Sequence, residues 1–138
     1  MKFLLTLLFS ATLFISNKIN AQDKVNITAT VINITSNDGK VGFALYSKDN
    51  FMQTPVQGTN GKIVDGKSTV TFKDVAPGEY AIVCYHDKNN NDKMDFSAQR
   101  MPLEDYGASN NYMAFAPPTF DNAKFVVSDK NVSLDIKF

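Results

Sequence analysis

The chain has 138 residues with 14 acidic and 14 basic side chains, so its formal net charge at pH 7 is zero. A chain of this length forms one domain with a modest hydrophobic core. The lysines are scattered among acidic residues, so no basic surface forms and nucleic-acid binding is not expected. Cys84 is the only cysteine, which excludes an internal disulfide.

Residues 1–21 have the layout of a secretory signal peptide. Lys2 precedes an apolar stretch that ends near Ile15, and Ala21 stands at an acceptable cleavage site. The alternative is a transmembrane anchor, but the stretch has only about half of the roughly 20 residues that cross a bilayer. We therefore predict a secreted or periplasmic protein with one mature domain, 22–138, and no transmembrane segment after cleavage. The residue directly after the cleavage site is Gln22 and not cysteine, so no lipid anchor is expected.

The mature part alternates apolar and polar residues in several short runs, a period that predicts β-strands. The turn residues Asn37–Gly39 suit a hairpin between the first two of these strands. The run Tyr80–Tyr85 is apolar on both faces, which predicts a central strand covered on both sides. The alternating runs are Val25 to Val31, Val41 to Leu45, Ser68 to Lys73 and Val132 to Phe138.

Clusters of Gly, Asn, Asp and Pro separate these runs, which favours an all-β fold, a single antiparallel β-sandwich. Two segments break the rhythm of the strands. Residues 46–60 are expected to form a loop with room for a helical turn. Residues 96–120 form a longer loop, which its aromatic and Met side chains are expected to hold in an ordered conformation; these include Tyr106, Tyr112, Met113, Phe115 and Phe120.

The segment that follows the apolar run has an oxygen-bearing side chain at every second position. This spacing folds a short loop around calcium, with side-chain oxygens at positions 1, 3 and 5, a carbonyl at 7 and a further ligand at 9. Met94, at position 8, is expected to pack the loop against the core. The predicted calcium ligands are Asp87, Asn89, Asn91, Lys93 through its backbone carbonyl, and Asp95.

Two positions depart from the calcium-loop pattern. Asp92 stands at position 6, where Gly normally makes a sharp turn, and Ala98 stands at position 12, where a bidentate Glu normally binds. Asp tolerates left-handed backbone better than most residues. Another acid must replace the missing Glu, and we predict Glu104, with Asp105 as the second candidate. The alternative is a solvated turn, because Asn and Asp favour turn geometry without any ion.

His86 and Cys84 lie close together in sequence, at the end of the predicted central strand. We predict a partly buried His86 bonded to a loop carbonyl, and a buried, unreactive Cys84 thiol. One histidine and one cysteine are too few for a transition-metal site. A hydrolase that uses His86 near the cation loop is an alternative, but the chain has no G-x-S-x-G sequence.

The segment His86–Asp95 and its surroundings resemble the DUF2141 family of secreted bacterial domains. The family pattern has Gly where this chain has Asp92 and Asp105. The resemblance implies an immunoglobulin- or transthyretin-like sandwich and a secreted or envelope location, and it implies no activity. It extends over Gly39–Tyr46, Pro77–Ala81, the loop itself, Pro102–Gly107, Ser109–Asn110 and Pro117–Phe125.

These observations predict a secreted, calcium-stabilised binding or accessory module and not an enzyme. The loop would be fastened to the long segment 96–120, which would present a rim of aromatic and amide side chains to a glycan, peptide or envelope partner. The alternatives are a structural envelope protein without a ligand and, less favoured, the hydrolase. The expected rim residues are His86, Tyr106, Asn110, Asn111 and Tyr112.

Overall fold

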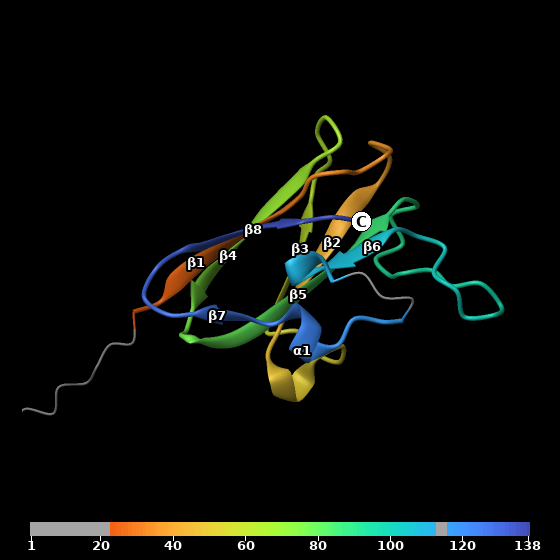
Figure 1. Ribbon diagram of the computed structural model, residues 1–138. Coiled ribbons are helices and arrows are strands. Elements are labelled where there is room, and N and C mark those ends of the chain that lie inside the picture. The colour runs from red at the N-terminus through yellow and green to blue at the C-terminus, as the bar shows by residue number, and fades with distance from the viewer. Residues whose placement is uncertain (1–22, 113–115) are drawn as a thin grey trace, which may run out of the picture.

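The computed structural model describes residues 23–112 and 116–138, and their strands form two packed sheets (Figure 1). Short helical turns lie between some of the strands. In chain order the elements are β1 (Val25–Val31), β2 (Lys40–Tyr46), η1 (Lys48–Asn50), β3 (Gln57–Gly61), β4 (Ser68–Val75), β5 (Gly78–Asp87), β6 (Tyr106–Ala108), η2 (Ser109–Asn111), α1 (Phe120–Ala123), β7 (Phe125–Val127) and β8 (Val132–Ile136).

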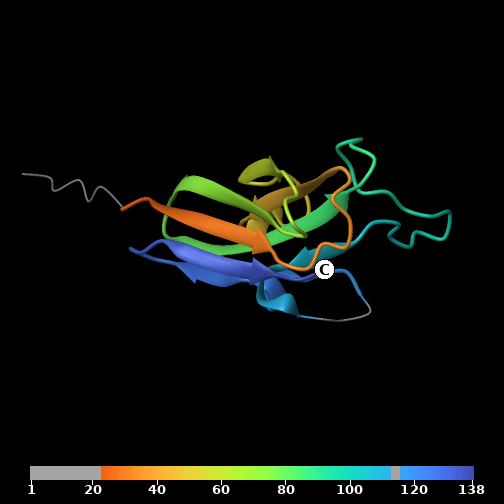
Figure 2. The ribbon, with the colours of Figure 1, turned by 90° about the horizontal axis from the view of Figure 1, so that it is seen from above.

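The smaller sheet has the strand order β4-β1-β8, and Figure 2 shows these three strands side by side. The larger sheet has the order β3-β2-β5-β6, and β7 pairs with another part of β5. All of these strand pairs are antiparallel except β1 with β8, which is parallel. The predicted all-β sandwich is therefore confirmed, with one parallel pair at an edge of its smaller sheet.

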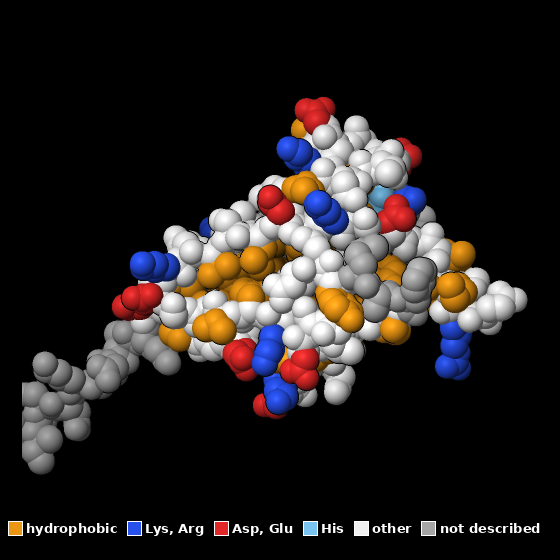
Figure 3. All heavy atoms as spheres, viewed as in Figure 1, with side chains coloured by type: hydrophobic (Ala, Val, Ile, Leu, Met, Phe, Trp, Pro, Cys, Tyr) orange, Lys and Arg blue, Asp and Glu red, His pale blue; other side chains and the backbone are white. Residues whose placement is uncertain are grey.

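The hydrophobic core lies between the sheets and follows the predicted alternation. Ile27 of β1 is paired with Phe72 of β4, and Phe43 of β2 is paired with Cys84 of β5; all four are buried. The intervening residues of the smaller sheet point outward, where threonine hydroxyls pair across β1 and β4 at 3.0 and 3.3 Å. At the open side of the sandwich, Figure 3 shows hydrophobic side chains between β8 and β7.

β5 is central in the larger sheet, as predicted, but only part of its outer face is covered. Ala81 packs against Phe120 and Ala123 of α1, in a small cluster separate from the main core. Further along the strand, Val83 and Tyr85 are half-buried and line an open groove. The expectation that the whole strand is covered on both faces is therefore wrong for its second half.

The predicted hairpin at Asn37–Gly39 is wrong, because β1 and β2 belong to different sheets. Gly39 has a φ of 72°, and a Cβ atom there would lie 2.0 Å from the carbonyl oxygen of Asp87. The turn therefore crosses between the sheets and packs against the beginning of the 87–95 loop. Only glycine combines this backbone conformation with so close an approach.

The segment 46–60 contains the expected helical turn, η1, but it is not a loop throughout. Its last residues belong to β3, which pairs with β2 along Gln57–Gly61. Small and polar residues fill this strand, so its sequence carries no apolar alternation.

The segment 96–120 contains β6 and η2, and its first part projects from the end of the sandwich in Figures 1 and 2. Phe96 and Pro102 form a β-bridge that closes this projection. Met113 and Phe115 lie outside the described residues, as does the predicted signal peptide. Within the described part of the chain, no helix is long and apolar enough to cross a membrane.

Candidate cation loop and adjoining groove

Asp87 ends β5 and shapes the loop that follows it. Its carboxylate is fully buried, with Oδ1 accepting the amide of Asn91 at 3.0 Å and Oδ2 that of Asp92 at 2.9 Å. Asp92, at the position where calcium loops normally have Gly, has a φ of 63°. The left-handed turn predicted at this position is therefore confirmed.

The two alternating asparagines stabilise the loop in two ways. Asn89 Oδ1 accepts the amide of Asn91 at 3.2 Å, and Asn91 Oδ1 accepts that of Lys93 at 3.1 Å. Their side-chain NH₂ groups donate to the Asp95 carboxylate at 2.7 to 3.0 Å. These bonds, first from Asn91 and then from Asn89, lower the pKa of Asp95 below its ordinary value of 3.8. Two of the predicted ligand side chains, Asn89 and Asn91, therefore meet at the carboxylate of a third, Asp95.

Glu104 closes the two ends of the loop. Its side chain is nearly buried, and its oxygens accept the amides of Lys88 at 3.0 Å and Asp95 at 3.1 Å. Leu103 adds a backbone bond to the Asp95 carbonyl at 2.9 Å. The structure thus brings Glu104 to the loop, whereas Asp105 forms an exposed ion pair with Lys88 at 3.5 Å.

Lys40 of β2 places a positive charge beside two of these carboxylates. Its Nζ is hydrogen-bonded to Asp92 Oδ1 and lies 3.7 Å from Asp87 Oδ2. The bond to Asp92 is the main reason that the pKa of Lys40 is raised. No trio of His, Cys, Asp or Glu in the described ranges is arranged to hold a metal ion. The predicted calcium ligands are not limited to these residue types, because they also include the amide oxygens of two asparagines and one backbone carbonyl.

His86 is completely buried, so it does not lie on a ligand rim. Its Nε2 donates to the carbonyl of Asp38 at 2.7 Å, and its ring stacks on Phe138 with the centroids 6.4 Å apart. The predicted bond to a loop carbonyl is confirmed, but burial is complete and not partial. Cys84 is also buried, as predicted, and burial raises the pKa of its thiol.

Asn110 and Asn111 were expected on the rim, but both hold η2 against neighbouring backbone. The Asn110 side chain donates to the carbonyls of Asn122 and Lys124 at 3.1 and 2.8 Å. Asn111 donates to the Asp135 carbonyl at 2.9 Å and accepts the Lys137 amide at 2.8 Å. Both asparagines have positive φ, so they give η2 its shape as well as its anchors.

Tyr106 and Tyr112, the remaining expected rim residues, both line a hollow of about 570 Å³. Asn111 and Glu104 contribute to the same hollow, so the structure brings part of the predicted rim next to the loop. Tyr112 is 60% exposed, whereas Tyr106 is half-buried in β6.

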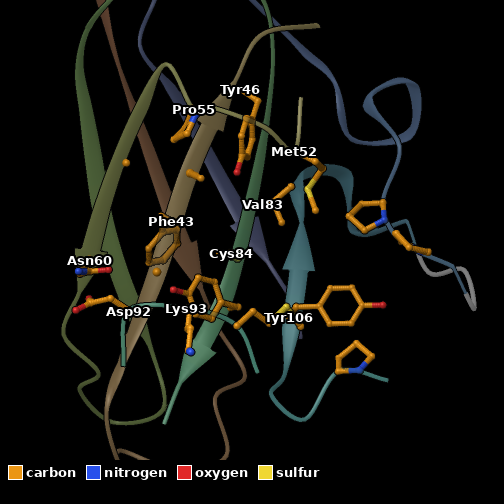
Figure 4. Close-up of a pocket in the computed structure, with 18 of the residues that line it drawn as sticks. Phe43, Tyr46, Met52, Pro55, Asn60, Val83, Cys84, Asp92, Lys93 and Tyr106 are labelled. Atoms are coloured by element: carbon orange, nitrogen blue, oxygen red, sulfur yellow. The ribbon is translucent and has the colours of Figure 1, made fainter. Parts of the chain in front are cut away.

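A larger groove, of about 900 Å³, was not predicted from the sequence. It lies over the outer face of the larger sheet, with Tyr46 and Met52 toward one end and the 87–95 loop at the other (Figure 4). Met94 was expected to pack the loop against the core, but it lines this groove instead. The sequence feature that could have predicted this groove is the apolar character of both faces of β5. The loop residues in its lining are Asp92, Lys93 and Met94.

No curated protein and no solved structure matches this chain. A family model does match, over residues 29–135, which include the 87–95 loop, Glu104 and every strand except the first part of β1 and the last residue of β8. Its description is that of an uncharacterized protein conserved in bacteria. The chain therefore belongs to the DUF2141 family.

Proposed function

We propose that this protein is a secreted or periplasmic binding module, not an enzyme, whose 87–95 loop is fastened by calcium. The observation that carries the proposal is the position of Asp87. A buried carboxylate is costly unless it is fully paired, and Asp87 accepts two amides of the loop that it begins. The loop thereby takes the sharp turn that a calcium loop needs.

Calcium would be held by oxygens of the residues that now surround the Asp95 carboxylate. Calcium prefers six to eight oxygen ligands, and carboxylates, amide oxygens and a backbone carbonyl are all suitable. Asn89 and Asn91 hold their side chains against Asp95 through hydrogen bonds. Each asparagine amide also has an oxygen, so Asn89 and Asn91 would supply amide oxygens to the ion and Asp95 would supply its carboxylate.

Glu104 supports the same proposal because it connects the loop to the segment 96–120. The missing Glu at position 12 of the loop leaves an ion short of oxygens and of negative charge. Glu104 supplies a nearly buried carboxylate at the point where both ends of the loop meet. A bound ion would therefore stabilise the contact between the loop and the segment that follows it.

A binding role is preferred over hydrolysis because of His86. A general base must come within hydrogen-bond reach of the group that it deprotonates. His86 is fully buried and already bonded to the Asp38 carbonyl. This arrangement supports a structural role for the histidine.

Thermal unfolding of the mature chain, in EGTA and in millimolar calcium, tests the calcium proposal. Ligand at about 100 times its Kd adds roughly 2.7 kcal/mol, and in a domain of this size that raises Tm by at least about 5 °C. Asp95→Asn should abolish the shift, because it removes the central charge while keeping the side-chain shape. Asp129→Asn, an exposed acid in the turn after β7, is the matched control and should keep it. No calcium shift in the native chain, or an equal shift in Asp95→Asn, contradicts the proposal.

A further inference from the structure

The outer face of the larger sheet has small and apolar residues, whereas a sheet face that contacts only solvent normally has polar ones. A solvent face of an antiparallel sheet normally has polar residues, as the paired threonines of the smaller sheet do. The outward positions here are Gly42 and Ala44 on β2 and Val83 and Tyr85 on β5. They are small or apolar, and α1 covers only the part of the face near Ala81.

An aromatic ring forms part of the floor of this groove. A Cβ atom on Gly42 would lie 2.7 Å from Cε1 of Tyr85 and 3.0 Å from its Cζ, so the ring rests directly over the glycine. Any larger residue at position 42 would push the ring away from the sheet.

Polar groups stand around the apolar floor. Asn60 of β3 lies at the edge, near Asp92 and Lys93 of the loop (Figure 4). The Asp92 carboxylate is already paired with Lys40. Among the ion pairs of the described residues, none involves Lys93, which leaves a positive charge at this end of the groove. Asp92 and Lys93 carry opposite charges at this end, and the charge of Lys93 also acts on the Asp95 carboxylate. The groove therefore combines an aromatic floor, a polar edge and, at one end, a lysine that joins no ion pair of the described residues.

We propose that this groove binds an acidic oligosaccharide. A sugar ring has a flat C–H face that packs on tyrosine rings, hydroxyl groups around its edge for Asn60 and the tyrosine hydroxyls, and, in a uronate, a carboxylate for Lys93. A fatty-acyl chain matches the floor but leaves the polar edge and the free charge without partners. The volume of about 900 Å³ lies within the range of small-ligand sites.

This proposal rests on the proposed function, because it names the class of ligand that the binding module takes. The loop supplies three consecutive residues of the groove, Asp92, Lys93 and Met94. A calcium ion that stiffens the loop therefore also fixes one wall of the groove. Rigid walls lower the entropy cost of binding, so affinity should rise when calcium is present.

Binding of the mature chain to a glycan array tests the assignment. The array contains oligosaccharides that carry uronate, sialate or sulfate groups, together with neutral counterparts of equal length. The expected result is retention on one or more acidic oligosaccharides and weaker retention on their neutral counterparts. Absence of retention on every acidic oligosaccharide, or equal retention on the neutral ones, overturns the proposal.

Variants then locate the site on the best acidic oligosaccharide. Ala44→Trp fills the groove from its floor and should weaken binding at least about tenfold. Tyr106 lines this groove as well as the smaller hollow, so Tyr106→Ala is the second variant if the first does not fold. Lys93→Gln should weaken binding about three- to fivefold, the size of an exposed ion pair. Lys73→Gln, on β4 of the other sheet, should bind as the native chain does. Native-like binding by a folded Ala44→Trp or Tyr106→Ala variant overturns the site.

Each binding measurement is made in EGTA and in calcium, with Tm recorded in parallel. Failure of the calcium proposal appears as an unchanged Tm. Failure of the groove assignment appears as absent or unaltered glycan binding, whatever Tm does. The two proposals are therefore separated by different readouts on the same samples.

Discussion

Glu104 accepts the backbone amide of Asp95 at 3.1 Å, and this bond joins two segments nine residues apart. The other carboxylate oxygen of Glu104 accepts the amide of Lys88 at the opposite end of the loop. One nearly buried side chain thus holds both ends of the 87–95 loop. The loop keeps its shape through this clamp and through Asp87, which acts from inside.

Glu104→Ala should destabilise the protein by about 2–4 kcal/mol, because two amides lose a charged acceptor at a nearly buried position. Urea unfolding in EGTA measures this loss without any contribution from an ion. Asp105→Ala is the matched control: its carboxylate is half exposed and forms only a surface ion pair, so the change should cost less than about 1 kcal/mol. Equal losses in the two variants would show that the clamp is not needed.

Asp92→Gly should relieve the left-handed backbone at position 6 of the loop. The φ of 63° costs a non-glycine residue about 1 kcal/mol, and glycine adopts it freely. The gain is partly offset by the loss of the surface pair with Lys40. We expect unchanged or slightly higher stability in EGTA, and a larger rise of Tm on adding calcium. A smaller calcium response than in the native chain would argue against a calcium-type turn here.

The hydrogen bonds that Asn91 and Asn89 donate to Asp95 predict a pH dependence. Because they lower the pKa of Asp95, their contribution to stability is fully present above the ordinary value of 3.8 and is lost as pH falls through the lower folded value. In Asn91→Ala, the pKa of Asp95 should move back up toward 3.8. An NMR titration of the Asp95 carboxyl carbon measures it directly, and an unchanged pKa would contradict the contact.

Gly39→Ala should destabilise the protein strongly. A Cβ at this position would lie 2.0 Å from the Asp87 carbonyl oxygen, and the φ of 72° is unfavourable for alanine. We expect a loss of more than about 2 kcal/mol in urea unfolding. Gly58→Ala is the matched control, since the nearest atom to its Cβ would be 3.8 Å away; its effect should lie within about 1 kcal/mol of zero.

Local patterns in the sequence determined much of this protein. Alternation of apolar and polar residues gave the strands with the core, because a period of two places every second side chain on one face. The spacing from Asp87 to Asp95 predicted a loop with a left-handed turn at Asp92, which the structure confirms. The bond from His86 to a loop carbonyl followed from its position at the end of a buried strand. The strands and the loop turn depend on neighbours within a few residues, whereas the residue that accepts the His86 bond, Asp38, is 48 positions away.

Tertiary structure alone decided how distant segments meet. The parallel pairing of β1 with β8 could be found only in the folded chain. The same holds for β3, because its residues Gln57–Gly61 show no apolar alternation. Asn110 and Asn111 are residue types that suit a ligand rim. Their side-chain amides instead donate hydrogen bonds to backbone carbonyls of Lys124 and Asp135, which are distant in sequence. α1 covers β5 near Ala81, and the groove lies over the next part of the same strand, at Val83 and Tyr85. Each of these outcomes depends on contacts between residues that are distant in sequence. The apolar-polar period of a strand shows which of its faces is buried, but it does not show which segment packs or pairs there.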